Sequence, residues 1–356
     1  MRFIHCSDLH LDSKMEANLS PARARQRNTE LCKTFERMVT YAKEHQVRAI
    51  LICGDLFDGL RTKLSTIHFV FRVMQQAPEI DFLYLRGNHD MRSLVFGNML
   101  PPNLKLFQNN WTTHTYGDTT ISGIEIDADS CRTLYHTLSL QAQNKNIVML
   151  HGQVASSPGL DEIALPLLTG KHIDYLALGH LHRYQAERLD YRGTYCYSGC
   201  LEGRGFDECG EKGFVVLDTD GVGIRSHFVP FAHRRLHDVS VNISNCTDNP
   251  QILDSIRSAT ADISERDLVK ITLIGNYPQQ LQKNLSFLET MLSTDFYCVR
   301  LTDASKLEIP NSVDMDVSLK SEFIRRVMHD TSLSPDDVEN ILQLGLAALR
   351  GEELEL

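Results

Sequence analysis

The sequence predicts an α/β protein, and two features of its first 230 residues indicate this class. Short apolar runs typical of strands alternate with longer amphipathic stretches typical of helices. The strand segments are apolar at nearly every position, as in a sheet that is buried on both faces. We expect strands at 3–6, 49–53, 82–85, 147–150, 175–178, 194–198 and 213–218, and helices at 29–45 and 65–77.

Two of these elements have recognisable ends. Thr29 is a candidate cap for the first helix, and Pro78 stops the second one. A change in pattern near Pro230 to Arg235 then ends the first domain. Further strands at 238–243 and 268–274 and helices at 250–260 and 278–293 predict a smaller α/β unit. A helical segment at 319–350 follows. We therefore expect three regions, 1–232, 233–312 and 313–356.

Composition excludes several classes of protein. The 356 residues are 42% hydrophobic and 23% charged, which is ordinary for a globular chain and excludes disorder and collagen. No run approaches the roughly 20 apolar residues of a membrane span. The first residues lack the apolar segment of a signal peptide, and the nine cysteines form no CxxC motif. These features predict a cytoplasmic protein with no membrane partner.

The net charge of −10 at first argues against nucleic acid, because a basic footprint is typical of proteins that bind it. The acidity is unevenly distributed, however. Residues 231–356 hold 20 acidic and 12 basic side chains, which leaves 26 and 24 for residues 1–230. The first domain is therefore close to neutral, and its charge does not exclude DNA.

Residue types that bind metals follow five of the predicted strands directly. Ligands bind at the carboxyl ends of strands in α/β sheets, so we expect these side chains to form one cluster. The five segments are Asp8-Leu9-His10, Gly54-Asp55-Leu56-Phe57-Asp58, Gly87-Asn88-His89-Asp90, His151-Gly152 and Gly179-His180-Leu181-His182.

These segments offer enough ligands for two cations. Carboxylate and imidazole together suit manganese, iron or zinc. Two metals about 3.5–4 Å apart are the usual device for displacement at a phosphate ester. The sequence therefore predicts a two-metal phosphoesterase whose candidate ligands are Asp8, His10, Asp55, Asn88, His151, His180 and His182.

The ordered set of motifs resembles the calcineurin-like metallophosphoesterase superfamily over about residues 1–230, and within it the SbcD-type DNA-repair exonucleases with their YhaO-like relatives. The opening Phe3-Ile4-His5-Cys6-Ser7-Asp8-Leu9-His10-Leu11 is similar to their first motif. Tyr197-Ser198-Gly199-Cys200-Leu201-Glu202-Gly203 and Lys212-Gly213-Phe214 are similar to a late one. The resemblance implies a β-sandwich flanked by helices, a smaller α/β capping domain that binds DNA, and a helical C-terminal tail that docks a partner.

The resemblance also implies roles for single residues. One metal would be held by Asp8, His10, Asp55 and His182, and the other by Asp55, Asn88, His151 and His180, with Asp55 as the bridge. His89 matches the catalytic histidine, which stabilises the transition state or protonates the leaving oxygen. Asp90 would hold its turn or orient His89. Asp58 departs from the pattern, since some members have a histidine there, and it would instead tune a metal ligand that it contacts. Manganese is the implied metal, with magnesium, iron or zinc as alternatives.

The implied activity is a DNA exonuclease or endonuclease in repair, in which a metal-bound hydroxide attacks the phosphodiester. The implied partners are DNA, a coiled-coil ATPase of the SbcC type and a second copy of the chain. Two other functions stay open: a phosphomonoesterase or cyclic-nucleotide phosphodiesterase with the same metals, and a non-catalytic scaffold for the ATPase. Basic residues near the motifs are candidate contacts to the DNA backbone: Arg23, Arg25, Arg27, Arg61, Lys63, Arg86 and Arg92.

Overall fold

Two six-stranded sheets form the centre of the first of two units, which comprises Met1–His237. The computed structural model describes the chain except residues 16, 18, 60–61, 91–99, 279, 309–317 and 350–356. The first sheet has the order β14-β13-β1-β2-β3-β4. Its strands are β1 (Arg2–Cys6), β2 (Val47–Cys53), β3 (Asp81–Leu85), β4 (Leu104–Leu106), β13 (Gly213–Asp218) and β14 (Arg225–Pro230).

The second sheet has the order β11-β12-β10-β7-β6-β5. Within it, β10 runs parallel to β7 and pairs Gly179 with His151, so two of the ligand-bearing strand ends lie side by side. Its strands are β5 (Thr112–Tyr116), β6 (Thr119–Gly123), β7 (Lys145–His151), β10 (Tyr175–Gly179), β11 (Gln185–Arg188) and β12 (Thr194–Tyr197). A short pair, β8 (Gln153–Ala155) and β9 (Glu162–Ala164), and a 3-10 turn at Leu165–Leu167 follow β7.

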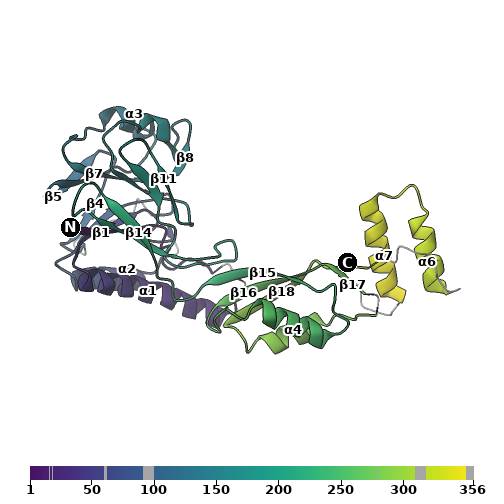
Figure 1. Cartoon of the computed structure of the whole chain (residues 1–356). Helices are drawn as coiled ribbons and strands as arrows, with labels where there is room; N and C mark the ends of the chain where they lie inside the picture. Colours follow the sequence, from purple (N-terminus) through teal and green to yellow (C-terminus); the bar gives the residue numbers. More distant parts are fainter. Residues whose placement is uncertain are drawn as a thin grey trace. The chain divides into compact units, whose positions relative to one another are not determined.

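Alternate residues of the central strands face two different apolar layers. Phe3 and Leu51 face the second sheet and lie in one core with Met149 and Ala177. Ile4 and its neighbours on the other face pack against α1 (Pro21–Glu44) and α2 (Leu64–Gln75), while α3 (Ser130–Thr137) packs on the second sheet. The strands are apolar throughout because both of their faces are covered. The predicted β-sandwich flanked by helices is confirmed (Figure 1).

The first helix begins earlier than the sequence pattern indicated. Pro21 occupies its first turn, and the Ser20 side chain caps it by accepting a 3.4 Å hydrogen bond from the Arg23 amide. Thr29 lies inside the helix and does not cap it. The early turns are largely exposed and carry little apolar periodicity, so the pattern became visible only from Leu31 onward.

The second unit, Asp238–Leu356, begins within β15 (Leu236–Asn242). A three-stranded sheet, β15-β16-β18, uses β16 (Leu268–Ile274) and β18 (Cys298–Asp303), and β17 (Asn276–Tyr277) pairs with β19 (Lys306–Leu307). Its helices are α4 (Asn249–Ala259), α5 (Leu285–Leu292), α6 (Leu319–Met328) and α7 (Pro335–Leu349). The helix expected at 278–293 is shorter, because Asn284 caps α5 through a 2.9 Å bond from the Phe287 amide. A separate tail starting at 313 stays a prediction.

The C-terminal helices α6 and α7 pack on one another. A side chain at Gly345 of α7 would meet the Phe323 ring of α6 at 2.1 Å, so only a glycine permits this approach. Among the described helices of the chain, none is long and apolar enough to cross a membrane.

Candidate metal centre

The strand ends of both sheets meet at one place, as their order predicted. The backbone amide of Asp8 donates a 3.0 Å hydrogen bond to Gly54 O, and that of His10 donates a 2.9 Å hydrogen bond to Asp55 O. These bonds connect the loop after β1 to the loop after β2. The sheets approach closely here, since a side chain at Gly179 would meet Cys53 O at 1.8 Å. Residues from both sheets therefore converge on one site.

The backbone at this site is strained. Asp8 and Asp55 both have φ of 53°, His10 has 43° and His180 has 106°, all in the left-handed region that non-glycine residues avoid. Each such residue costs on the order of 1–3 kcal/mol, and such strain clusters at functional sites. The strain aims these side chains at a common point.

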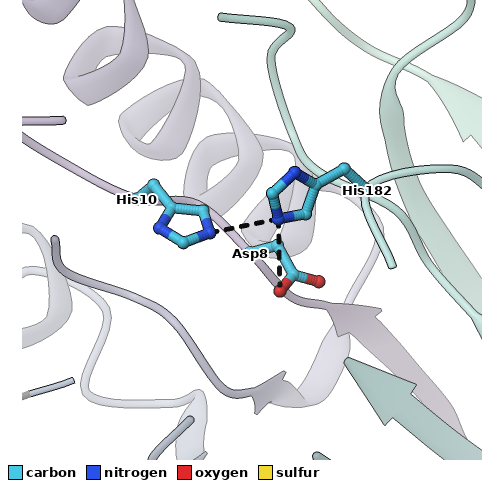
Figure 2. Close-up of side chains that lie close together, drawn as sticks. All are labelled: Asp8, His10 and His182. Carbon is cyan, nitrogen blue, oxygen red and sulfur yellow. Dashed lines mark hydrogen bonds and ion pairs between the residues drawn. The ribbon is translucent and has the colours of Figure 1, made fainter. Parts of the chain in front are cut away.

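The first group of candidate ligands is formed by Asp8, His10 and His182 (Figure 2). The Nε2 atoms of His10 and His182 lie 3.2 Å apart, and His182 Nε2 lies 3.9 Å from Asp8 Oδ1. His10 Nε2 is also 3.6 Å from Asp55 Oδ2. Burial lowers the pKa of His10 to about 2, so its ring is neutral and able to donate a lone pair.

The second group adjoins the first through Asp55. His151 Nε2 lies 3.5 Å from Asp55 Oδ2 and 3.0 Å from Asn88 Oδ1. The His180 amide donates to both oxygens of Asp8, at 3.0 and 3.1 Å, and its ring lies edge-on to that of His151. The seven predicted residues therefore lie near one another. Asp8 and Asp55 both lie close to His151, and the His180 ring joins this group through its contact with the His151 ring.

The proton positions indicate a cation here. His151 Nδ1 lies 2.9 Å from Cys53 O, and a carbonyl only accepts, so Nδ1 carries the proton. The lone pair of His151 Nε2 then faces the Asp55 carboxylate, another acceptor. Buried acceptors aimed at one another repel unless a proton or a metal cation lies between them. Imidazole, carboxylate and amide ligands fit divalent transition metals.

His89 and Asp58 lie at the edge of this site. The His89 side chain is 55% exposed, with its Nδ1 3.8 Å from Asp58 Oδ1 and its ring edge-on to His10. Asp58 Oδ1 is also 3.5 Å from His10 Nδ1. The His89 amide, and not its ring, donates to Asp55 Oδ1 at 2.9 Å. The ring is thus available to a substrate.

Asp90 lies behind the site and holds its loops together. Its carboxylate accepts from the amides of Asp55 at 2.7 Å, Phe57 at 3.0 Å and Gly87 at 2.9 Å. Burial, followed by the nearby charge of Asp55, raises the pKa of Asp90 to about 6. These contacts place Asp90 at the turn.

The basic residues expected to contact DNA differ in their exposure and in their ion pairs. Arg23, Arg25 and Lys63 are exposed, although Lys63 pairs with Asp12 at 3.2 Å. Arg86 is tied to Glu125 at 2.8 Å and lines a cavity of about 410 Å³ that Asn88 and His151 also line. Arg61 and Arg92 lie outside the described residues.

Arg27 requires a correction. Its side chain is 1% exposed and donates to Glu30 at 2.7 Å and to Glu202 at 3.0 Å, so it does not reach a DNA backbone from this position. A helix turns by 100° per residue, so Arg25 and Arg27 lie on opposite sides of α1 and Arg27 faces the core, whereas Arg23 lies in the exposed first turn.

Sequence reasoning missed the partners of His182. Glu208 accepts from His182 Nδ1 at 2.7 Å and is itself held by Arg204 at 2.6 Å. Burial opposes ionisation of Glu208, but its hydrogen bonds from His182 and Arg204 lower its pKa. Neither residue follows a strand as the ligands do. Their nearness to the late motif at 197–203 was the one available signal.

The two-sheet fold and the cluster of candidate ligands at its strand ends are typical of a metal-dependent phosphoesterase. Residues 1–184 match the model of the calcineurin-like phosphoesterase family, and the chain belongs to this family. The expected class of metal-dependent phosphoesterase is confirmed at the level of the family.

Curated relatives agree with the narrower resemblance. The chain is 24% identical over 361 residues to the DNA double-strand break repair protein Mre11 of Methanosarcina acetivorans, covering 95% of this chain and 57% of that protein. It is 24% identical to the uncharacterized metallophosphoesterase YhaO of Bacillus subtilis, over 79% and 73% of the two chains. The Mre11 of Sulfurisphaera tokodaii is 28% identical over 68% and 66%. The chain thus spans little more than half the length of the first of these relatives.

Proposed function

We propose that this protein is a two-metal nuclease that hydrolyses phosphodiester bonds of DNA during repair. The observation that carries the proposal is that His10 Nε2 and His151 Nε2, from the ends of β1 and β7, both face the buried Asp55 carboxylate, at 3.6 and 3.5 Å. The relatives support the choice of substrate, because several of them are named as DNA double-strand break repair proteins.

The chain's own residues would hold the two cations. Asp8, His10 and His182 would bind one of them, and Asn88, His151 and His180 the other, with Asp55 shared. When bound, such cations lower the pKa of a water and neutralise charge on the phosphoryl oxygens. The mixed carboxylate and imidazole set suits manganese, iron or zinc, and the resemblance to the nuclease family favours manganese, with magnesium as a further alternative.

His89 would act on the substrate directly. Its exposed ring lies beside His10, with Asp58 close to its Nδ1. From there it would donate a proton to the leaving oxygen or a hydrogen bond to the phosphoryl group. Asp58 would orient that ring, and Asp90 would keep Asp55 in place.

Binding of DNA would use basic side chains near the site and the second unit. Arg23, Arg25 and Lys63 are exposed in the first unit, and Arg86 borders the cavity next to Asn88. Phosphate contacts of this kind position a backbone without reading its sequence. The second unit would cap the bound DNA.

An ATPase of the SbcC type would dock on α6 and α7 in the cytoplasm. These helices leave several large apolar side chains exposed, as a docking helix does: Leu319, Met328, Ile341, Leu344 and Leu349. Ile341→Ser with Leu344→Ser should weaken copurification of the ATPase, whereas Phe287→Ser on α5 should not. A second copy of the chain is a further proposed partner.

The deciding experiment incubates the purified chain and Asp55→Asn with Mn²⁺ and one of three substrates: linear DNA, bis-p-nitrophenyl phosphate or p-nitrophenyl phosphate. Loss of DNA with the wild type alone supports the nuclease. Cleavage of the small esters with intact DNA favours the phosphomonoesterase or cyclic-nucleotide phosphodiesterase. Bound Mn²⁺ without cleavage of any substrate favours the scaffold.

A further inference from the structure

The two groups of candidate ligands differ in the partners of the imidazole Nδ1 atoms, which face away from the proposed cations. In the first group, His182 Nδ1 faces the Glu208 carboxylate at 2.7 Å, and His10 Nδ1 has the Asp58 carboxylate 3.5 Å away. In the second group, His151 Nδ1 faces only the neutral carbonyl of Cys53. An imidazole backed by a carboxylate is the more basic ligand.

Burial and hydrogen bonds hold Glu208 in its contact with His182. It is 5% exposed, and Arg204 holds both of its oxygens, through the guanidinium at 2.6 Å and through the backbone amide at 2.8 Å. The Arg204 guanidinium also lies 3.1 Å from His182 Nδ1, but it donates to Glu208. The shorter 2.7 Å contact is to the Glu208 carboxylate, which only accepts, so we assign the proton to His182 Nδ1 and the lone pair to His182 Nε2, toward Asp8. The side-chain ammonium of Lys212 also holds His182, by donating a 2.7 Å hydrogen bond to the backbone oxygen of His182.

We propose that Glu208, held by Arg204, is a positioning residue that makes the His182 side the tighter of the two cation sites, so that the Asn88 side fills second. This inference rests on the proposed two-metal centre. It does not depend on the identity of the substrate, because it concerns only how the empty protein takes up metal.

Calorimetric titration of the metal-stripped chain with Mn²⁺ tests the proposal. The wild type should show two binding events, and Asn88→Ala should abolish the weaker one. Glu208→Gln, which keeps the shape of the side chain, should weaken the tighter event about 10–100-fold and change the weaker one less than about 3-fold. Glu211→Gln is the matched control, because Glu211 lies three residues after Glu208 in the sequence and forms an exposed ion pair with Arg235.

Arg204→Lys supplies a second variant, since it keeps the charge and the backbone amide but loses the hydrogen bonds of the guanidinium to Glu208. It should weaken the same event by a smaller factor, and it serves if Glu208→Gln does not fold, as judged by circular dichroism. Unchanged affinities in the folded variants, an equal loss at both sites, or a loss confined to the weaker site would overturn the proposal. A wild type that takes up two Mn²⁺ ions yet leaves DNA intact would contradict the nuclease function alone.

Discussion

Arg27 donates a 3.0 Å hydrogen bond to Glu202, and both side chains are 1% exposed. Glu202 also accepts from Thr34 at 2.7 Å, so the pair joins α1 to the loop after β12. Breaking a buried ion pair on one side leaves a charge without a partner, which costs about 3–5 kcal/mol.

Arg27→Gln should therefore lower the free energy of unfolding by several kcal/mol, measured in urea. The matched control is Arg25→Gln, two residues away on the exposed face of α1, which should leave stability nearly unchanged. A loss of less than about 1 kcal/mol for Arg27→Gln would show that the pair is not stabilising.

The same network predicts a dependence of stability on pH. Burial opposes ionisation of Glu30, but bonds from Arg234 at 2.8 Å and Arg27 at 2.7 Å outweigh it and lower the pKa of Glu30 to about 2. A carboxyl group whose pKa falls on folding stabilises the protein above its unfolded value, about 4.5, and loses this contribution as the pH falls toward about 2. The unfolding free energy of the wild type should decrease over this window.

Glu30→Gln removes the titrating group and should flatten that decrease. Urea unfolding of both proteins at pH 5.5 and pH 3, with metal removed, measures the effect. The difference between them should be larger at pH 5.5. If it were the same at both values, Glu30 would not contribute through its charge.

His89→Ala should separate metal binding from catalysis. Asp55 accepts from the amide of residue 89, which alanine retains, so the site should still bind two Mn²⁺ ions. Loss of a proton donor typically lowers the rate about 10²–10⁴-fold. Hydrolysis of bis-p-nitrophenyl phosphate and Mn²⁺ titration are the two measurements. His68→Ala, an exposed histidine of α2, is the control, and undiminished hydrolysis by His89→Ala would refute its role.

Removal of metal should lower thermal stability. A ligand that binds only the folded state stabilises it by about 2.7 kcal/mol at a hundred times its Kd. Mn²⁺ should therefore raise the melting temperature of the stripped wild type by several degrees and that of Asp55→Asn by much less. Burial raises the pKa of Asp55 and the nearby Asp8 adds to the effect, so the stripped Asp55→Asn should be at least as stable as the stripped wild type. An equal rise in both proteins would mean that Mn²⁺ binds elsewhere.

The sequence by itself determined the class of fold and the set of candidate metal ligands. Strands covered on both faces must be apolar throughout, and polar residues that interrupt the pattern where strands end must serve another purpose. This local pattern singles out Asp8, His10, Asp55 and the four other candidate ligands. It also found Asp90, although not the three amides that its carboxylate accepts from.

Only the tertiary structure decided which charged residues serve the site and which serve the core. Arg25 and Arg27 are indistinguishable in sequence, but the helix exposes one and buries the other against Glu202, which lies 175 residues away in the chain. Glu208 has no motif of its own and becomes a partner of His182 because the loop after β12 folds back over it. Such long-range pairings depend on how the sheets pack, and no local pattern encodes them.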